Sequence, residues 1–262
     1  MSSGRRGTIE KALRARIDAG GKCLVPYITG GFDGYLDAIR AATVAGADAI
    51  EVGIPFSDPV MDGPVIQQAN EIVLANGVTP QSIIDDVAGL DVDVPMAVMT
   101  YYNIAYRAGL QRFASSLSVS DIAGAILPDL PLGELGPWAE AADAAGVETV
   151  LLAAPTTTDE RLPRICERSR GFVYAVGLLG VTGERDELAA SATIIAGRCK
   201  DVTDKPVLVG VGVSTPQQAA KVSEVADGCV VGTAIVRRLL EGGGPGAVGD
   251  LVGDLRAALD AG

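Results

Sequence analysis

Short apolar runs alternate with helix-like stretches along the whole chain, and this alternation is the feature that most restricts the fold. The runs are rich in Val, Ile, Leu and Ala and lack a polar face, as is typical of strands buried on both sides. We expect strands at residues 23–29, 48–52, 95–101, 123–127, 148–153, 172–176, 206–211 and 228–231. We expect helices at residues 8–17, 35–45 (capped by Asp33), 65–76, 80–89 (capped by Thr79), 110–117, 134–145, 160–168, 215–225, 234–240 and 248–261, with one more ending near Cys199.

Eight strand–helix units in about 240 residues are the number that a (β/α)8 TIM barrel needs. The first helix and a second helix after the second strand are additions to that plan. An open doubly wound sheet is the competing fold, but no GxGxxG follows the first strand. We therefore predict one TIM-barrel domain over residues 1–262, with extra N-terminal and loop helices and with residues 1–7 flexible.

Charge and hydropathy restrict the partners. The formal net charge is −12, and no basic stripe is present, which argues against nucleic acid and membrane surfaces as partners. No run reaches the roughly 18 apolar residues of a membrane helix. The two arginines near the start of the chain are not followed by an apolar stretch, so we expect neither a signal peptide nor an anchor and predict a cytoplasmic protein.

The chain contains no histidine, which excludes zinc sites built on histidine, Ser-His triads and histidine acid–base pairs. Its four cysteines lack CxxC spacing, so we expect reduced thiols rather than a disulfide or metal framework. Proton transfer would fall to carboxylates, tyrosine, lysine, cysteine or water.

Residues 49–70, AIEVGIPFSDPVMDGPVIQQAN, contain the first candidate site. Glu51 interrupts an apolar strand, where a carboxylate is costly unless it is paired, protonated or functional. Asp62 follows eleven residues later on a loop stiffened by prolines and could face Glu51. An apolar environment would raise the pKa of Glu51 and let it exchange a proton near neutral pH. The structural alternative is a glutamate bound by nearby hydroxyls, with Asp58 and Asp62 capping turns; Asp58 is expected to be structural.

Glycines follow the last two predicted strands, in VGVGVS at residues 209–214 and VGTAI at residues 231–235. In TIM barrels a phosphate commonly binds there, on backbone N–H groups. The alternative is that these glycines only form tight turns. The stretch GVTG at residues 180–183, after Tyr174, could close over a ligand, or could be an ordinary flexible loop.

Taken together and in this order, these stretches resemble the tryptophan synthase alpha chain. The resemblance extends from LVPYITGG in the first strand to VVGTAIV in the last, and EVGIPFSDPVMDGP is its most specific part. It implies a carbon–carbon lyase of tryptophan biosynthesis that cleaves indole-3-glycerol phosphate to indole and D-glyceraldehyde 3-phosphate without a metal or organic cofactor. It also implies a beta-chain partner that carries pyridoxal phosphate, in an alpha2-beta2 heterotetramer, and a docking surface that includes Asn103 and Pro131.

Residue roles are implied by the same resemblance. Glu51 and Asp62 correspond to the catalytic acids and Tyr174 to the active-site tyrosine. The other correspondences concern substrate binding: the closing loop with Thr182 and Gly183; the phosphate site with Gly210, Gly212, Gly232 and Thr233; and the indole pocket with Tyr27, Ile66, Met99, Ile126 and Val211. Three alternatives stay open: another phosphosugar enzyme, a free-standing indole-releasing lyase, and a catalytically silent barrel that activates a partner.

Overall fold

A computed structural model describes residues 7–177, 185–210 and 212–261 of the chain. In these residues the strands form a closed barrel in sequence order, with every neighbouring pair parallel and the last strand pairing with the first. The strands are β1 (Cys23–Thr29), β2 (Ile50–Gly53), β3 (Met96–Met99), β4 (Ile122–Ile126), β5 (Glu148–Ala153), β6 (Val173–Ala175), β7 (Val207–Val209) and β8 (Gly228–Val231). The predicted TIM barrel is confirmed.

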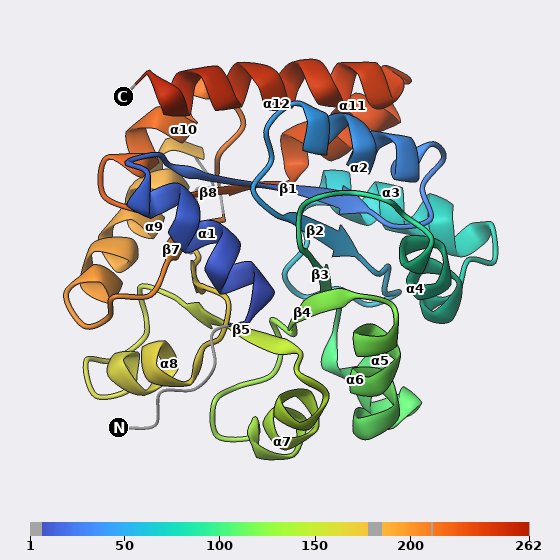
Figure 1. Cartoon of the computed structure of the whole chain (residues 1–262), viewed down its shortest axis with the longest axis horizontal. Coiled ribbons are helices and arrows are strands. Elements are labelled where there is room, and N and C mark those ends of the chain that lie inside the picture. Colours follow the sequence, from blue (N-terminus) through green and yellow to red (C-terminus); the bar gives the residue numbers. More distant parts are fainter. Residues whose placement is uncertain (1–6, 178–184, 211, 262) are drawn as a thin grey trace.

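Helices cover the outside of the barrel (Figure 1). They are α1 (Thr8–Asp18), α2 (Tyr35–Val44), α3 (Pro64–Ala75), α4 (Pro80–Ala88), α5 (Tyr102–Ala108), α6 (Leu110–Val119), α7 (Gly136–Ala145), α8 (Leu162–Arg168), α9 (Arg185–Lys200), α10 (Pro216–Ser223), α11 (Thr233–Leu240) and α12 (Gly244–Asp260). The side chain of Thr79 caps α4 as expected, in a capping box with Ser82.

Several details of the sequence prediction are wrong, and three of them concern the starts of helices. The sequence analysis did not predict α5, whose first N–H group, on Tyr102, donates to Asp129 Oδ1 at 2.8 Å. That cap comes from a residue far away in sequence, so no local signal marks the start of the helix. Asp33 does not cap α2, because Gly34 takes that position with φ at +73°. The last helix begins at Gly244, four residues before the predicted start at residue 248.

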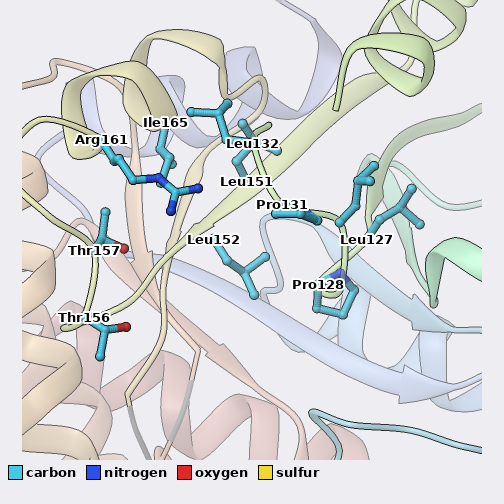
Figure 2. A pocket seen from close by; sticks show the side chains of 11 residues that line it. Leu127, Pro128, Pro131, Leu132, Leu151, Leu152, Thr156, Thr157, Arg161 and Ile165 are labelled. Carbon is cyan, nitrogen blue, oxygen red and sulfur yellow. The ribbon is translucent and has the colours of Figure 1, made fainter. Parts of the chain in front are cut away.

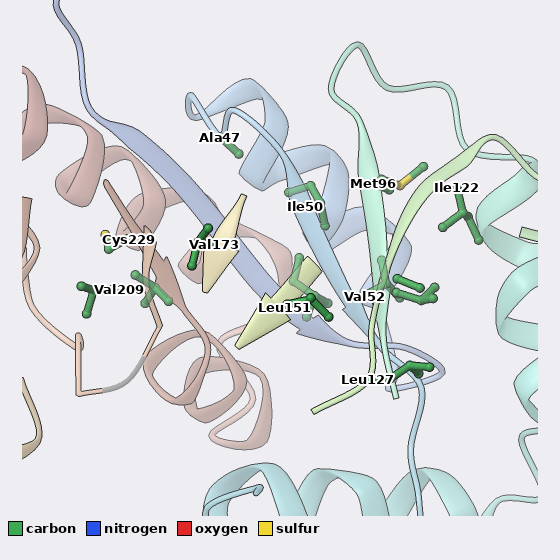
Figure 3. Packing of buried hydrophobic residues seen from close by; sticks show 14 of the residues in the cluster. Ala47, Ile50, Val52, Met96, Ile122, Leu127, Leu151, Val173, Val209 and Cys229 are labelled. Atoms are coloured by element: carbon green, nitrogen blue, oxygen red, sulfur yellow. The ribbon is translucent and has the colours of Figure 1, made fainter. Parts of the chain in front are cut away.

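The core has two layers, because successive side chains of a strand point to opposite faces. Residues such as Ile50, Val52 and Val209 face outward and pack under the helices (Figure 3). Residues such as Val25 and Leu208 face inward and fill the barrel. Each fully buried aliphatic side chain stabilises the fold by roughly 1.5–3 kcal/mol. The same alternation determines which polar side chains enter the barrel.

The N-terminal end of the barrel is closed by α1. Ile9 and Leu13 are buried and pack with the inward-facing side chains of the strands, and Figure 1 shows α1 crossing the ring of strands. The carboxylate of Glu148 accepts hydrogen bonds from the N–H groups of Ile9 at 2.7 Å and Glu10 at 3.0 Å. Glu148 thus caps the helix from β5 and fixes it over the barrel.

All four cysteines are buried free thiols. Among the described residues, no cluster of three or more His, Cys, Asp or Glu side chains could hold a metal ion. None of the helices in the described ranges has the length and apolar character needed to cross a membrane.

Candidate active site

The strand alternation places three polar side chains inside the barrel. Glu51 lies between the outward-facing Ile50 and Val52, and Tyr174 lies between two outward-facing residues of β6. Tyr27 is the register partner of Glu51 across β1 and β2. Glu51 is only 2% exposed, and Tyr174 Oη donates to Glu51 Oε2 at a long 3.4 Å. A glutamate, a phenol and a second phenol therefore share the interior of the barrel.

The carboxyl group of Glu51 favours its protonated form. Burial raises the pKa of Glu51 to about 8, since the apolar interior disfavours the charged form. The hydrogen bond from Tyr174 opposes that shift, and the negative charge of Asp62 adds to it. The charge of Asp62 is one of the influences on this pKa, so the two carboxyl groups are close enough to interact electrostatically.

Asp62 lies on the loop between β2 and α3 and is held from several sides. Asn70 Nδ2 donates to Asp62 Oδ2 at 3.2 Å, and Gln67 Nε2 donates to the backbone carbonyl of Asp62 at 2.7 Å. The hydroxyl of Tyr101 lies beside the carboxylate and lowers the pKa of Asp62. Burial raises the pKa of Asp62 to about 6, and the hydrogen bonds from Tyr101 and Asn70 limit the rise.

These two pKa values give the two carboxyl groups different charge states near neutral pH. At pH 7 Asp62 is mostly ionised, whereas Glu51 is mostly protonated. A neutral acid and a neighbouring carboxylate form a pair in which one group can donate a proton while the other stabilises positive charge. The structural alternative, a glutamate bound by nearby hydroxyls, stays open on geometry alone, since the hydroxyl of Tyr174 donates to Glu51. Asp58 is exposed and accepts a hydrogen bond from the hydroxyl of Ser57.

Two glycines make room for the two phenols. An ideal Cβ on Gly210 would lie 1.6 Å from Tyr174 Cε2, and one on Gly53 would lie 2.0 Å from Tyr27 Oη. Real Cβ atoms do not approach other heavy atoms so closely, so any side chain at either position would displace a tyrosine. The absence of a side chain at Gly210 therefore allows Tyr174 to occupy its position. This requirement was not predicted from the sequence.

Apolar side chains predicted to bind indole gather around Tyr27. Tyr27, Ile66 and Met99 pack in one cluster, and Ile126 is the register partner of Met99. Met99 and Ile126 also belong to the inner layer of the barrel. The structure brings these four residues together, whereas Val211 lies outside the described residues.

The glycines predicted to bind phosphate follow β7 and β8. Gly210 comes directly after β7, and Gly212 has φ at +85°. Gly232 occupies the N-cap position of α11, and Thr233 is the first residue of that helix. A helix N-terminus attracts anions through its free N–H groups and dipole. Thr182 and Gly183 of the predicted closing loop lie outside the described residues.

Tyr101 and Asn70, the two side chains that lie against the carboxylate of Asp62, were not predicted from the sequence. Tyr101 follows β3 closely, and a polar residue at the carboxyl end of a barrel strand is a signal for the active site. Asn70 carries no such signal, because only the path of α3 brings it back to Asp62.

A separate cavity of about 220 Å³ lies at the carboxyl ends of β4 and β5 (Figure 2). Leucines and prolines such as Leu127, Pro131 and Leu152 form its walls, and Arg161 is its charged residue. A second cavity of about 470 Å³ lies between α4, α5 and α6. Neither is lined by Glu51 or Asp62.

Comparison with known proteins adds independent information. The sequence model of the family described as "Tryptophan synthase alpha chain" matches residues 13–245. The chain is 43% identical to the tryptophan synthase alpha chain of Thermobifida fusca, covering 97% of each sequence. It is also 43% identical to that of Streptomyces coelicolor, covering 91% of this chain and 90% of the relative.

Solved structures give the same result. A structure of Mycobacterium tuberculosis tryptophan synthase superimposes with a TM-score of 0.90 at 36% identity, covering 98% of this chain and all of the other. The tryptophan synthase alpha chain of Legionella pneumophila subsp. pneumophila superimposes with a TM-score of 0.86 at 32% identity, covering 98% of each chain.

Proposed function

This chain belongs to the tryptophan synthase alpha chain family, and from that premise we propose how its residues carry out the family's reaction. The reaction is the retro-aldol cleavage of indole-3-glycerol phosphate to indole and D-glyceraldehyde 3-phosphate, a carbon–carbon lyase step of tryptophan biosynthesis. The observation that carries the proposal is the buried pair of Glu51 and Asp62, with pKa values raised to about 8 and about 6.

Glu51 acts as the acid and then as the base. Its carboxyl proton is transferred to indole C3, which removes the ring's aromatic character and leaves a positive charge shared with the ring nitrogen. The bond from C3 to the glycerol chain then breaks, and its electron pair returns to the ring. The hydroxyl on the departing carbon loses its proton to the Glu51 carboxylate as the aldehyde forms, so Glu51 ends the cycle protonated.

Asp62 stabilises the charge that this protonation creates. As an ionised carboxylate it accepts a hydrogen bond from the indole N–H, and this interaction strengthens as the ring becomes cationic. Tyr174, which donates to Glu51, orients the acid toward C3. For these roles Glu51 must be neutral and Asp62 must be charged near pH 7, which their different pKa values allow.

The rest of the substrate is assigned to two regions. The indole ring would lie against Tyr27, Ile66, Met99 and Ile126, together with Val211. The phosphate would bind N–H groups at Gly210, Gly212, Gly232 and Thr233, with Thr182 and Gly183 of the closing loop completing the enclosure. Backbone donors suit a chain of net charge −12, since they attract an anion without adding side-chain charge.

A tryptophan synthase beta chain is the proposed protein partner. Exposed apolar residues support a docking surface near Asn103: Val60 is 74% exposed, Met61 47% and Tyr106 65%. The N–H of Met61 donates to the hydroxyl of Tyr101, one residue before α5, so these side chains project from adjoining segments. We propose an alpha2-beta2 assembly in the cytoplasm, with Pro131 in the same surface, pyridoxal phosphate bound only by the partner, and no organic cofactor or metal on this chain.

Indole release from indole-3-glycerol phosphate tests the proposal. The purified full chain is assayed alone and again with a beta chain. Slow release that rises steeply with the partner is the expected result. Fast release from the chain alone would favour a free-standing lyase. No release under either condition would overturn the roles of Glu51 and Asp62 and favour a catalytically silent barrel.

A further inference from the structure

Tyr101 contacts the active-site loop at three points, and no role in the reaction has been assigned to it above. Its side chain is buried, with 2% of the residue exposed. It lies two residues after β3 and occupies the N-cap position of α5, so a strand on one side and a helix on the other fix its backbone. A phenol held in this way is a rigid support for a loop.

The side chain of Tyr101 connects two parts of that loop. It accepts a hydrogen bond from the N–H of Met61 at 3.0 Å, and it lies close enough to the carboxylate of the next residue, Asp62, to lower the pKa of that group. The ring stacks on Phe56, with centroids 5.1 Å apart and planes 28° apart. Tyr101 therefore contacts the start of the loop through its ring and the end of the loop through its hydroxyl.

The hydroxyl keeps its proton over the whole working range. Burial raises the pKa of Tyr101 to about 12, with the charge of Asp62 adding to the rise. An un-ionised phenol that accepts from Met61 has its own proton free to donate to the carboxylate. Hydrogen bonds of this kind, donated to an ionised group, are stronger than those between neutral groups.

Asn70 contacts the same carboxylate from another element. The residue is 3% exposed and donates to Asp62 Oδ2 at 3.2 Å from α3. Two donors on different elements fix the direction of a carboxylate that neither donor could fix alone. Tyr101 differs from Asn70 because it also holds the backbone beside Asp62, at Met61.

We propose that Tyr101 is a positioning residue for the lyase reaction: its hydroxyl holds the carboxylate of Asp62 and the adjoining loop in the orientation that receives the indole N–H. The inference rests on the function proposed above, because it assumes that Asp62 contacts the substrate. A purely structural Tyr101 would stabilise the loop without affecting the chemistry or titration of Asp62.

The test is Tyr101→Phe in the full chain, which removes the hydroxyl and keeps the ring that stacks on Phe56. We expect kcat for indole release to fall by about 10- to 100-fold, the range for a lost hydrogen bond to a charged group. The acid limb of the kcat/KM profile should move to higher pH, because Asp62 loses a donor that favours its ionised form. The unfolding midpoint is measured alongside.

Tyr102→Phe is the matched control. This neighbouring tyrosine packs its ring on Tyr106, with centroids 5.9 Å apart, so the same substitution removes a hydroxyl one position away. It should leave kcat and both limbs of the pH profile unchanged. An equal effect of the two substitutions would overturn the proposal.

Carbon-13 NMR of side-chain carboxyl groups separates this inference from the proposed function. The resonance of Asp62 is the one absent from Asp62→Asn, and its titration is compared in the wild type and Tyr101→Phe. A shift to higher pH is expected in Tyr101→Phe. An unshifted titration, together with an unshifted activity profile, would make Tyr101 merely structural. Full activity in Asp62→Asn would instead overturn the catalytic role of Asp62.

Discussion

The ring of Tyr174 occupies the space in which a side chain at position 210 would lie. An ideal Cβ on Gly210 falls 1.6 Å from Cε2 of that ring, and the phenol of Tyr174 in turn donates to Glu51. A glycine on β7's carboxyl end thus controls the environment of an acid on β2, across the interior of the barrel.

Gly210→Ala should lower kcat by about tenfold or more, because the added methyl group forces Tyr174 away from Glu51. The measurement is indole release under saturating substrate. Gly253→Ala in α12 is the control, since an added Cβ there meets nothing within 4 Å. Unchanged turnover in Gly210→Ala would mean that the contact between Tyr174 and Glu51 does not matter to the reaction.

The pH dependence of kcat/KM should be bell-shaped. Activity requires ionised Asp62, which is lost as the pH falls through about 6, and protonated Glu51, which is lost as the pH rises through about 8. The maximum should lie near pH 7. Rates measured from pH 5 to 9 test this, and a rate that keeps rising above pH 8 would contradict the role of Glu51 as the acid. Because the two groups interact, the apparent pKa values of the two limbs belong to the pair and not to either residue alone.

Glu51→Gln should abolish turnover while binding of a substrate analogue stays nearly intact, and it should stabilise the fold above about pH 5. The folded-state pKa of Glu51 is raised to about 8 from an ordinary value of 4.5, so the folded chain retains a proton that the unfolded chain releases. Glu51 therefore costs stability progressively as the pH rises from 4.5 to 8. At pH 8 the gain from removing it is on the order of a few kcal/mol.

Urea unfolding at pH 5 and pH 8 measures that stability effect, with Glu160→Gln at an exposed position as the control. The gain in Glu51→Gln should be larger at pH 8, whereas Glu160→Gln should change little at either pH. A variant that loses analogue binding as strongly as turnover would show that Glu51 is structural.

Gly212→Asp should chiefly raise KM, because it places a negative charge beside the proposed phosphate site. Gly212→Asn is the matched control: it has the same shape without the charge, and Asn tolerates the positive φ of +85° about as well. We expect KM to rise about tenfold more in the Asp variant, with the excess shrinking at high salt. Equal KM values in the Asp and Asn variants would mean that the phosphate binds elsewhere.

Glu148→Ala should destabilise the chain by about 1–3 kcal/mol, because the N–H groups of Ile9 and Glu10 lose their acceptor. Unfolding in urea measures the loss, and Glu167→Ala on the exposed side of α8 is the comparison. Indole release at low temperature should stay close to that of the wild type. A drop in kcat with unchanged stability would contradict a purely structural role for Glu148.

The sequence predicts best what depends on local pattern. The limits of β1, β5 and β8 were predicted as the structure has them, because apolar runs bounded by turns define a buried strand. Glu51 was identified because a carboxylate in such a run conflicts with burial. Both inferences need only the residue and its immediate neighbours.

What the sequence did not predict depends on contacts between distant segments. The start of α5 depends on Asp129, and the orientation of Asp62 depends on Tyr101 and Asn70. The reason for a glycine at position 210 becomes visible only when Tyr174 lies against it. Such requirements are set by the closed barrel, which brings the ends of eight described strands to one rim.

The closure of the barrel by α1 has a consequence for the movement of small molecules. With Ile9 and Leu13 filling the opposite end, the proposed substrate would enter, and both products would leave, on the side of the rim at the carboxyl ends of the described strands. Indole and the phosphorylated aldehyde would therefore leave from the same face of the barrel. A partner bound over that face would determine whether indole reaches water, so the destination of the product would be set outside the chain that makes it.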